Sequence, residues 1–274
     1  MNTGPVGIFD SGLGGLTVWR ELRRQLPNED IVYFADSRNC PYGRKSAGEI
    51  IALAHNITDL LLTSYGCKLI VVACNTATAA AIDDLRQSYQ NPFVGMEPAI
   101  KQAALNTNTG RVGVLATKGT FDGRLYKQTS RKYANDIDVM VQIGDGLVEL
   151  VEKNEYESDE ARKLLHKYID PMLEHSVDQI VLGCTHYPFY KPQIEAIVGS
   201  RVTVIDPAPA VARHVGEVLF EQDLKNAEKR AGADIFLSSG SIEPMQVLLT
   251  TMNNCGYSRR MVQVEGGQTY ESLS

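Results

Sequence analysis

The chain has 274 residues, 43 % hydrophobic and 22 % charged, enough for one large domain or two ordinary ones with a substantial core. A net charge of −6, with no basic run interleaved with aromatic residues, argues against nucleic acid as a partner. The longest apolar runs, such as residues 69–74 (LIVVAC), are strand-length and too short to span a bilayer, so we expect no contact with a membrane.

The amino terminus and the cysteines indicate the compartment. The first ten residues, MNTGPVGIFD, lead almost at once into a predicted strand and contain no charged segment followed by an apolar one. The five cysteines form no C-x-x-C pair and are odd in number: Cys40, Cys67, Cys74, Cys184 and Cys255. We therefore expect a cytoplasmic protein with free thiols.

Strands and helices alternate along the first third of the chain. The apolar segment VGIFD (6–10) predicts a strand, GLTVWRELRRQL (15–26) a helix and IVYFAD (31–36) a second strand. A long helix is predicted over 46–66, with Ser46 as its N-cap and Gly66 as its stop, before the strand KLIVVAC (68–74). This alternation is typical of a parallel sheet covered by helices on both faces.

The pattern restarts near residue 111 and indicates a weak internal repeat. VGIFDSG (6–12) matches VGVLATK (112–118), and VVACNT (71–76) matches VLGCTH (181–186). The tail carries a long helix (210–230), the strand ADIFLSS (233–239), and a further helix and strand, and we expect it to complete the first sheet.

The predicted fold is α/β, with two pseudo-symmetric parallel-sheet domains that face each other across an active-site cleft. Proline-bearing crossing points near residues 97 and 206 set the boundaries. Residues 1–97 plus 207–274 form the first domain, and residues 98–206 the second.

Cys74 and Cys184 occupy matched positions, each closing an apolar strand before a helical segment. Backbone N–H groups and the positive end of the helix dipole favour a thiolate there, which lowers the thiol pKa from about 8.5. Two buried structural cysteines remain the alternative. Cys40, Cys67 and Cys255 lack this context, and we interpret them as structural.

Polar residues at four strand ends converge on one cleft if the domains face each other, because ligands bind beyond the carboxyl ends of parallel strands. Asp10 precedes the turn DSGLGG, whose glycines predict close backbone approach to a ligand carboxylate or phosphate. His186 is a candidate acid/base group next to Cys184, while Glu152 reads as a solvated helix charge. Asn75, Thr76, Thr117, Thr120 and Thr185 suit a small zwitterion, or serve as caps.

Two opposed thiols fit inversion at a carbon acid, in which one base removes the Cα proton and an acid on the other face returns one. No lysine lies in an obvious pyridoxal phosphate pocket, so we expect no cofactor. The Cys-x-His spacing of Cys184 and His186 is not that of a zinc site, so we expect no metal.

Together, the motifs GIFDSGLGGLTV, PYG, ACNTATA, EPA and GCTHYP resemble the bacterial glutamate racemases of the cofactor-independent aspartate/glutamate racemase superfamily. The resemblance runs from about Val6 to Asp206. It implies interconversion of L- and D-glutamate, which supplies D-glutamate for peptidoglycan. Ser37, Cys40 and Met96 depart from the family pattern.

The resemblance also implies roles for residues. Cys74 and Cys184 are then the acid/base thiols, Asp10 supports Cys74, and His186, with Glu152 as its partner, supports Cys184. The implied substrate-binding residues are Asp10, Ser11, Pro41, Tyr42, Gly43, Asn75, Thr76, Thr117, Thr120, Thr185 and His186.

Three alternatives remain open from the sequence: a racemase for aspartate or another amino acid, a non-catalytic small-ligand or nucleotide-binding module, and a thiol redox protein. The last requires Cys74 and Cys184 close enough to bridge. The oligomeric state is open as well, a homodimer included, because no helix face specifies it.

Overall fold

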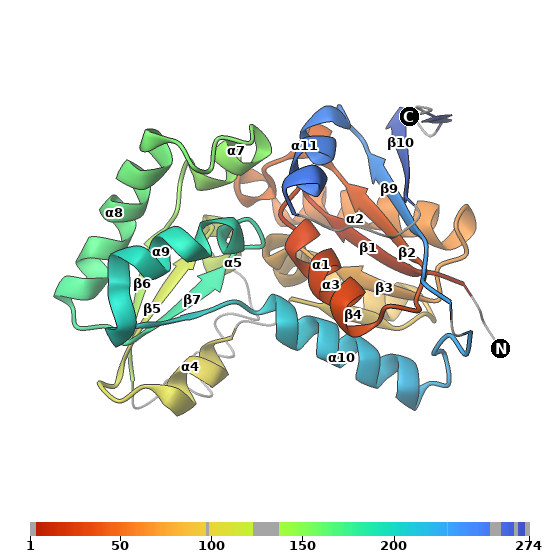
Figure 1. The fold of residues 1–274 in the computed structure, drawn as a ribbon. Coiled ribbons are helices and arrows are strands. Elements are labelled where there is room, and N and C mark those ends of the chain that lie inside the picture. Colours follow the sequence, from red (N-terminus) through yellow and green to blue (C-terminus); the bar gives the residue numbers. More distant parts are fainter. Residues whose placement is uncertain are drawn as a thin grey trace.

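The protein folds into two lobes, each built on its own β-sheet (Figure 1). The computed structural model describes residues 4–96, 99–122, 137–228, 230–252, 259–265 and 268–271. Within that part of the chain the larger sheet has the strand order β11-β10-β9-β2-β1-β3-β4, and the smaller has the order β6-β5-β7-β8. Residues from the tail thus join the sheet formed by the first third of the chain, as predicted.

The strands are β1 (Val6–Asp10), β2 (Ile31–Ala35), β3 (Leu69–Val72), β4 (Phe93–Gly95), β5 (Arg111–Ala116), β6 (Asp138–Ile143), β7 (Gln179–Gly183), β8 (Thr203–Ile205), β9 (Asp234–Ser238), β10 (Arg259–Glu265) and β11 (Gln268–Glu271). The α-helices are α1 (Leu16–Gln25), α2 (Ala47–Thr63), α3 (Asn75–Ser88), α4 (Ile100–Asn106), α5 (Lys118–Asp122), α7 (Leu147–Glu152), α8 (Asp159–Glu174), α9 (Lys191–Val198), α10 (Ala208–Glu221) and α11 (Glu243–Thr251). Short 3₁₀ turns are η1 (Ser37–Asn39), η2 (Tyr42–Arg44), η3 (Tyr187–Tyr190) and η4 (Gly199–Arg201).

The two sheets share one topology, which confirms the predicted fold class and explains the internal repeat. The order β2-β1-β3-β4 in one lobe corresponds to β6-β5-β7-β8 in the other. The register agrees too: Val6 pairs with Leu69, and the matched Val112 pairs with Gln179. All described pairings are parallel except that of β10 with β11 at the edge of the larger sheet.

Alternate residues of each strand face opposite sides of the sheet, and each side has its own helices. On β1, Val6 and Ile8 pack in a cluster with α1, α10 and α11, whereas Phe9 packs with α2 and α3. In the smaller sheet, Val112 and Val114 face α4. The opposite face of the smaller sheet packs against α7, α8 and α9.

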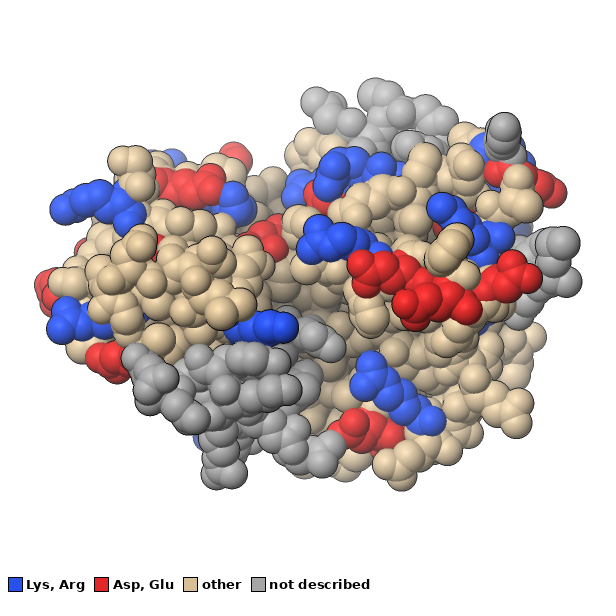
Figure 2. Space-filling model, turned by 90° about the horizontal axis from the view of Figure 1, so that it is seen from below, with Lys and Arg blue, Asp and Glu red and all other residues tan. Residues whose placement is uncertain are grey.

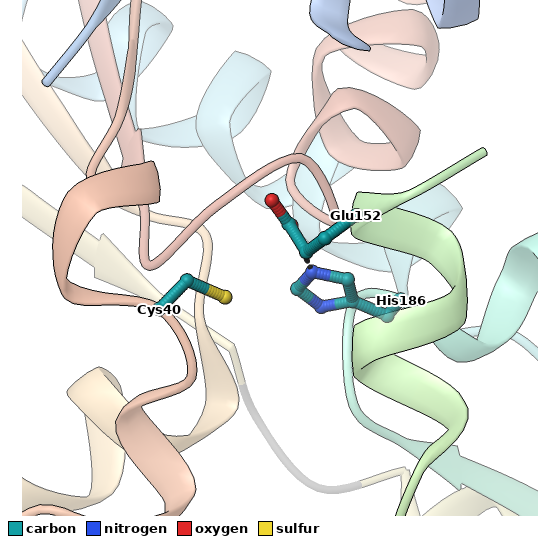
Figure 3. A group of neighbouring side chains, drawn as sticks. All are labelled: Cys40, Glu152 and His186. Carbon is teal, nitrogen blue, oxygen red and sulfur yellow. Dashed lines mark hydrogen bonds and ion pairs between the residues drawn. The ribbon is translucent and has the colours of Figure 1, made fainter. Parts of the chain in front are cut away.

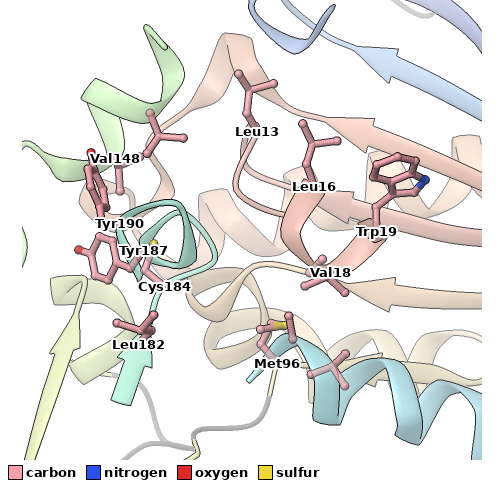
Figure 4. Close-up of a cluster of buried hydrophobic side chains, with 14 of the residues drawn as sticks. Leu13, Leu16, Val18, Trp19, Met96, Val148, Leu182, Cys184, Tyr187 and Tyr190 are labelled. Carbon is pink, nitrogen blue, oxygen red and sulfur yellow. The ribbon is translucent and has the colours of Figure 1, made fainter. Parts of the chain in front are cut away.

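One hydrophobic cluster continues from lobe to lobe. It includes Leu16 and Trp19 of α1, Met96 after β4, and Tyr187 and Tyr190 of η3 (Figure 4). Cys184 belongs to the same cluster. Because burial of apolar side chains stabilises contacts without regard to direction, this shared core holds the carboxyl ends of β1 and β7 near each other.

Two helix ends show what local sequence determines. Ser46 caps α2 as predicted, in a capping box with Glu49: the Ser46 hydroxyl accepts from the Glu49 N–H, and the Glu49 carboxylate accepts from the Ser46 N–H. The helix predicted over 210–230 ends earlier, at Glu221. There Asp223 takes a φ of 54°, and Asn226 bonds instead to Asn28 and Glu29 at the base of β2.

The domain boundaries, 1–97 plus 207–274 and 98–206, stay a prediction, and Cys255 lies outside the described residues. On the face in Figure 2, Lys and Arg side chains are interspersed with Asp and Glu. No helix in the described ranges is both long and apolar enough to cross a bilayer.

The capping box predicts the effect of one exposed substitution. Ser46→Ala leaves N–H groups at the start of α2 without their side-chain acceptor, so we expect the free energy of unfolding to fall by about 1 kcal/mol. Urea denaturation measures it. Ser64→Ala, an exposed serine at the other end of the same helix, is the control. An equal effect from both substitutions would contradict the capping role.

Candidate active site

The carboxyl ends of β1, β3, β5 and β7 meet between the lobes and enclose a small cavity. The cavity brings together residues from all four strand ends and from the η1–η2 loop: Ser11, Pro41, Tyr42, Gly43, Cys74, Asn75, Thr76, Thr117, Val148, Cys184, Thr185 and His186. All but Val148 are residues that the sequence singled out.

Asp10 lies at the end of β1 and is fully buried. Its carboxylate accepts from the Gly12 N–H at 3.0 Å and from the Thr185 hydroxyl of the other lobe at 3.2 Å. Burial raises the pKa of Asp10, and the neighbouring Glu152 raises it further, whereas His186 and backbone N–H groups lower it. Asp10 thus connects the two lobes from behind the cavity.

Cys74 is the N-cap of α3, and its sulfur accepts from the Ala77 N–H at 3.4 Å. Its S–H donates to the Ser11 hydroxyl at 3.7 Å. The predicted lowering of its pKa is wrong: burial, together with the charge of Asp10, raises the pKa of Cys74 to about 12. The helix N-terminus is outweighed because a dry site penalises the thiolate.

Cys184 follows β7 but does not begin an α-helix. The turn η3 comes first, and α9 starts only at Lys191, so the helix dipole that the sequence predicted at Cys184 is absent from this position. Its sulfur faces His186 instead, with 3.7 Å between Sγ and Nδ1. The two cysteines therefore have different neighbours despite their matched positions.

His186 is held by a carboxylate from α7. Its Nε2 lies 2.7 Å from Oε1 of Glu152, which also accepts from the Leu13 N–H at 2.6 Å (Figure 3). Burial lowers the pKa of His186, but hydrogen bonds with Cys184, Cys40 and Glu152 outweigh it and raise this pKa well above 6.5. Glu152 is therefore not a solvated helix charge.

The glycine turn after β1 approaches protein side chains. A Cβ on Gly12 would lie 2.2 Å from Oε1 of Glu152, and one on Gly14 would lie 2.3 Å from Nδ1 of His186. The lack of a Cβ at both glycines thus makes room for side chains of the other lobe, whereas backbone approach to a ligand stays a prediction. The two glycines let the lobes come close enough for Leu13 to reach Glu152.

A group of hydroxyls joins the lobes on the other side of the cavity. Thr76 of α3 lies 2.9 Å from Thr117, which lies 2.9 Å from Thr120 (oxygen to oxygen). Beside them, Oδ1 of the buried Asn75 has no hydrogen-bond partner among the described residues. An unpaired buried carbonyl is costly, so this oxygen suits an N–H donor of a ligand.

The cavity has about 10 Å³ of room, that of one water molecule, which is less than an amino acid requires. It adjoins a pocket of about 580 Å³ that shares Pro41, Gly43, Thr76, Thr117 and Val148 with it. At the mouth of this pocket, Arg44 forms a 2.9 Å ion pair with Glu149 across the lobes.

Some residues near the cavity lie elsewhere than the sequence predicted. Asp10, Thr120 and Glu152 do not line it but contact residues that do. Val148, an apolar wall on α7, carried no signal in the sequence. Cys40, which the sequence assigned a structural role, lies beside His186. The other four histidines each pair with a surface carboxylate: His55, His166, His175 and His214.

Comparison with known proteins shows which family the chain resembles. The family model described as Asp/Glu/Hydantoin racemase matches residues 12–215. A glutamate racemase from Herpetosiphon aurantiacus is 48 % identical over 88 % of this chain and 94 % of its own length.

The chain belongs to the glutamate racemases of this family. Two solved structures share the racemase fold. An Escherichia coli glutamate racemase in complex with L-glutamate and the activator UDP-MurNAc-ala has a TM-score of 0.83 at 30 % identity, covering 96 % of this chain and 98 % of its own. A Francisella tularensis glutamate racemase in complex with D-glutamate has a TM-score of 0.82 at 28 % identity, with the same coverage.

A substitution in the glycine turn of the racemase tests whether the two lobes must pack closely at Gly14. Gly14→Ala places a methyl group against His186, so we expect a loss of about 1–3 kcal/mol in stability and a marked loss of racemase activity. Gly48→Ala on α2 is the control, because its Cβ meets nothing within 4 Å. Full activity of Gly14→Ala would contradict the predicted clash.

The His186–Glu152 pair predicts a pH dependence. Because the folded-state pKa of His186 is raised, its protonated form stabilises the fold fully below about pH 6.5, and this contribution disappears as pH rises through the raised pKa. NMR of protein labelled with ¹⁵N-histidine should show His186 titrating with a midpoint above pH 6.5. In Glu152→Gln the midpoint should move to lower pH. A wild-type midpoint at or below 6.5 would refute the assignment.

Proposed function

We propose that this protein interconverts L- and D-glutamate by proton transfer at Cα between two cysteines, without a cofactor. The single observation that carries the proposal is that Cys74 and Cys184 approach one cavity from two lobes of matched topology. Relatives named glutamate racemase, two of them solved with L-glutamate and D-glutamate, support the choice of substrate.

In this mechanism one thiolate removes the Cα proton, and the thiol on the opposite face donates a proton to the planar carbanion. The roles exchange for the opposite enantiomer. Burial keeps Cys74 protonated in the free protein at neutral pH, which prepares it as a proton donor. Hydrogen bonds with Cys184, Cys40 and Glu152 raise the pKa of His186, and its ring faces the Cys184 sulfur, so it can exchange a proton with that thiol.

The same cavity offers groups for the substrate. The free Oδ1 of Asn75 suits the ammonium, and hydroxyl and backbone donors suit the carboxylates: Ser11, Thr76, Thr117 and Thr185. Pro41, Tyr42 and Gly43 form the wall from the η1–η2 loop. Thr120 positions Thr117, and Asp10 positions Thr185.

Binding requires the cavity to widen, because its present volume suits one water molecule. The adjoining pocket provides the route, and separation of the Arg44–Glu149 pair opens its mouth. Closure afterwards excludes water, which strengthens the electrostatic interactions that stabilise the carbanion. We further propose that the enzyme acts in the cytoplasm and supplies D-glutamate for peptidoglycan synthesis.

Incubation of each glutamate enantiomer in D₂O tests the reaction. A two-base enzyme places solvent deuterium at Cα of the product, while recovered substrate keeps its protium at early times. Optical rotation and mass spectrometry measure both. No deuterium uptake and no change in rotation would exclude the racemase proposal, and faster turnover of aspartate would reassign its substrate.

The two-thiol step is tested by Cys74→Ser and Cys184→Ser. Since acid/base groups contribute about 10²- to 10⁴-fold, each change should lower kcat/KM for both enantiomers by that factor. Cys67→Ala is the matched control, since Cys67 is buried before the start of β3, at the opposite end of that strand from Cys74, and does not line the cavity. Ligand binding without turnover in wild type, unaffected by either serine, would favour a non-catalytic binding module.

A further inference from the structure

A third cysteine, Cys40, lies beside His186 and has no part in the mechanism described above. It ends η1 and immediately precedes Pro41 of the cavity wall. Its sulfur, a ring nitrogen of His186 and a carboxylate oxygen of Glu152 all lie within 4.8 Å of one another. In Figure 3 the Cys40 side chain points toward His186 from the loop of one lobe, while Glu152 and His186 come from the other lobe.

These three donors are of the types that zinc prefers. Thiolate, imidazole and carboxylate are all zinc donors in proteins, and three protein ligands with one position open for water are typical of catalytic zinc sites. Bond lengths of about 2.0–2.3 Å give donor separations of about 3.5 Å in a tetrahedral site. The 2.7 Å His186–Glu152 pair must therefore open slightly, and the Cys40 sulfur, already within 4.8 Å of both, must reach a similar separation from each.

We propose that Cys40, Glu152 and His186 form a binding site for a soft divalent cation such as Zn²⁺, and that occupancy inhibits the enzyme. The ion forms bonds to one sulfur, one nitrogen and one oxygen. Two protons leave for the solvent, one from the Cys40 S–H and one from the His186 imidazolium. The ion thereby replaces the proton that His186 shares with Glu152.

The bound ion would inhibit the enzyme in two ways: by coordinating His186 and by joining the two lobes. His186 no longer exchanges a proton with Cys184, because its ring is fixed and uncharged by coordination. Cys40 and Glu152 belong to different lobes, so the ion also crosslinks the cavity that has to widen for an amino acid. The binding is independent of the function proposed above, whereas the inhibition rests on it.

Binding is measured directly on the full-length protein. Calorimetric titration with Zn²⁺ should give one ion per chain, and Co²⁺ should give a thiolate-to-metal charge-transfer band in the near ultraviolet. Loss of an outer-shell partner alone costs metal sites about 10- to 100-fold in affinity, so Cys40→Ser should weaken Zn²⁺ binding by about 100-fold or more and abolish the band. Cys67→Ala should retain both.

Circular dichroism and the melting temperature confirm that Cys40→Ser is folded, which its partly exposed position favours. Unchanged Zn²⁺ affinity in this variant would overturn the proposal. So would binding that survives Cys40→Ser and is lost in Cys184→Ser, because the ion would then lie on the Cys184–His186 pair. Failure of wild type to bind Zn²⁺ or Co²⁺ overturns it as well.

Measurement of racemase activity in the presence of Zn²⁺ is the second test of the proposal. Micromolar Zn²⁺ should lower racemisation by the wild type, and a chelator should restore it. Within Cys40→Ser, the Zn²⁺ concentration for half inhibition should rise by the same factor as the dissociation constant. If no racemisation is detected in any variant while Zn²⁺ binding depends on Cys40, the proposed function fails and the metal site stands. Equal inhibition of both proteins would overturn the proposed inhibition.

Discussion

One carboxylate oxygen joins the two halves of the site. Oε1 of Glu152 accepts from the Leu13 N–H of one lobe and bonds to Nε2 of His186 in the other. Charge-assisted hydrogen bonds of this kind are strong and directional, and here both lie in a region largely shielded from water. The position of His186 and the closeness of the glycine turn both depend on this oxygen, which also contributes, after Cys184 and Cys40, to the raised pKa of His186.

The glycines and the shared core make that contact geometrically possible. Gly12 and Gly14 have no Cβ to collide with Glu152 and His186, and the apolar cluster around Leu16, Met96 and Tyr187 packs the lobes together behind them. The cavity is small because these contacts are tight. The same tightness dehydrates Cys74 and raises the pKa of its thiol.

The matched topology of the two sheets gives each lobe one cysteine, yet their surroundings differ. Cys74 lies at the N-terminus of α3, donates to the Ser11 hydroxyl and is close enough to the buried Asp10 for its charge to raise the thiol pKa. Cys184 contacts an imidazole. A pseudo-symmetric scaffold thus presents two thiols with separate means of adjusting their protonation, which suits a reaction that runs in both directions.

The sequence by itself determined the β/α alternation, the α2 cap at Ser46, the repeat and the strand ends, because these depend on residues close together in the chain. Together with the family resemblance, it also predicted every residue that lines the cavity except Val148. Only the tertiary structure decided that Glu152 meets His186, that Gly12 and Gly14 face side chains, that Cys74 is a dry thiol, and that Cys40 lies at His186. Each of these joins residues far apart in the chain, and burial, which sets their energies, has no local signature.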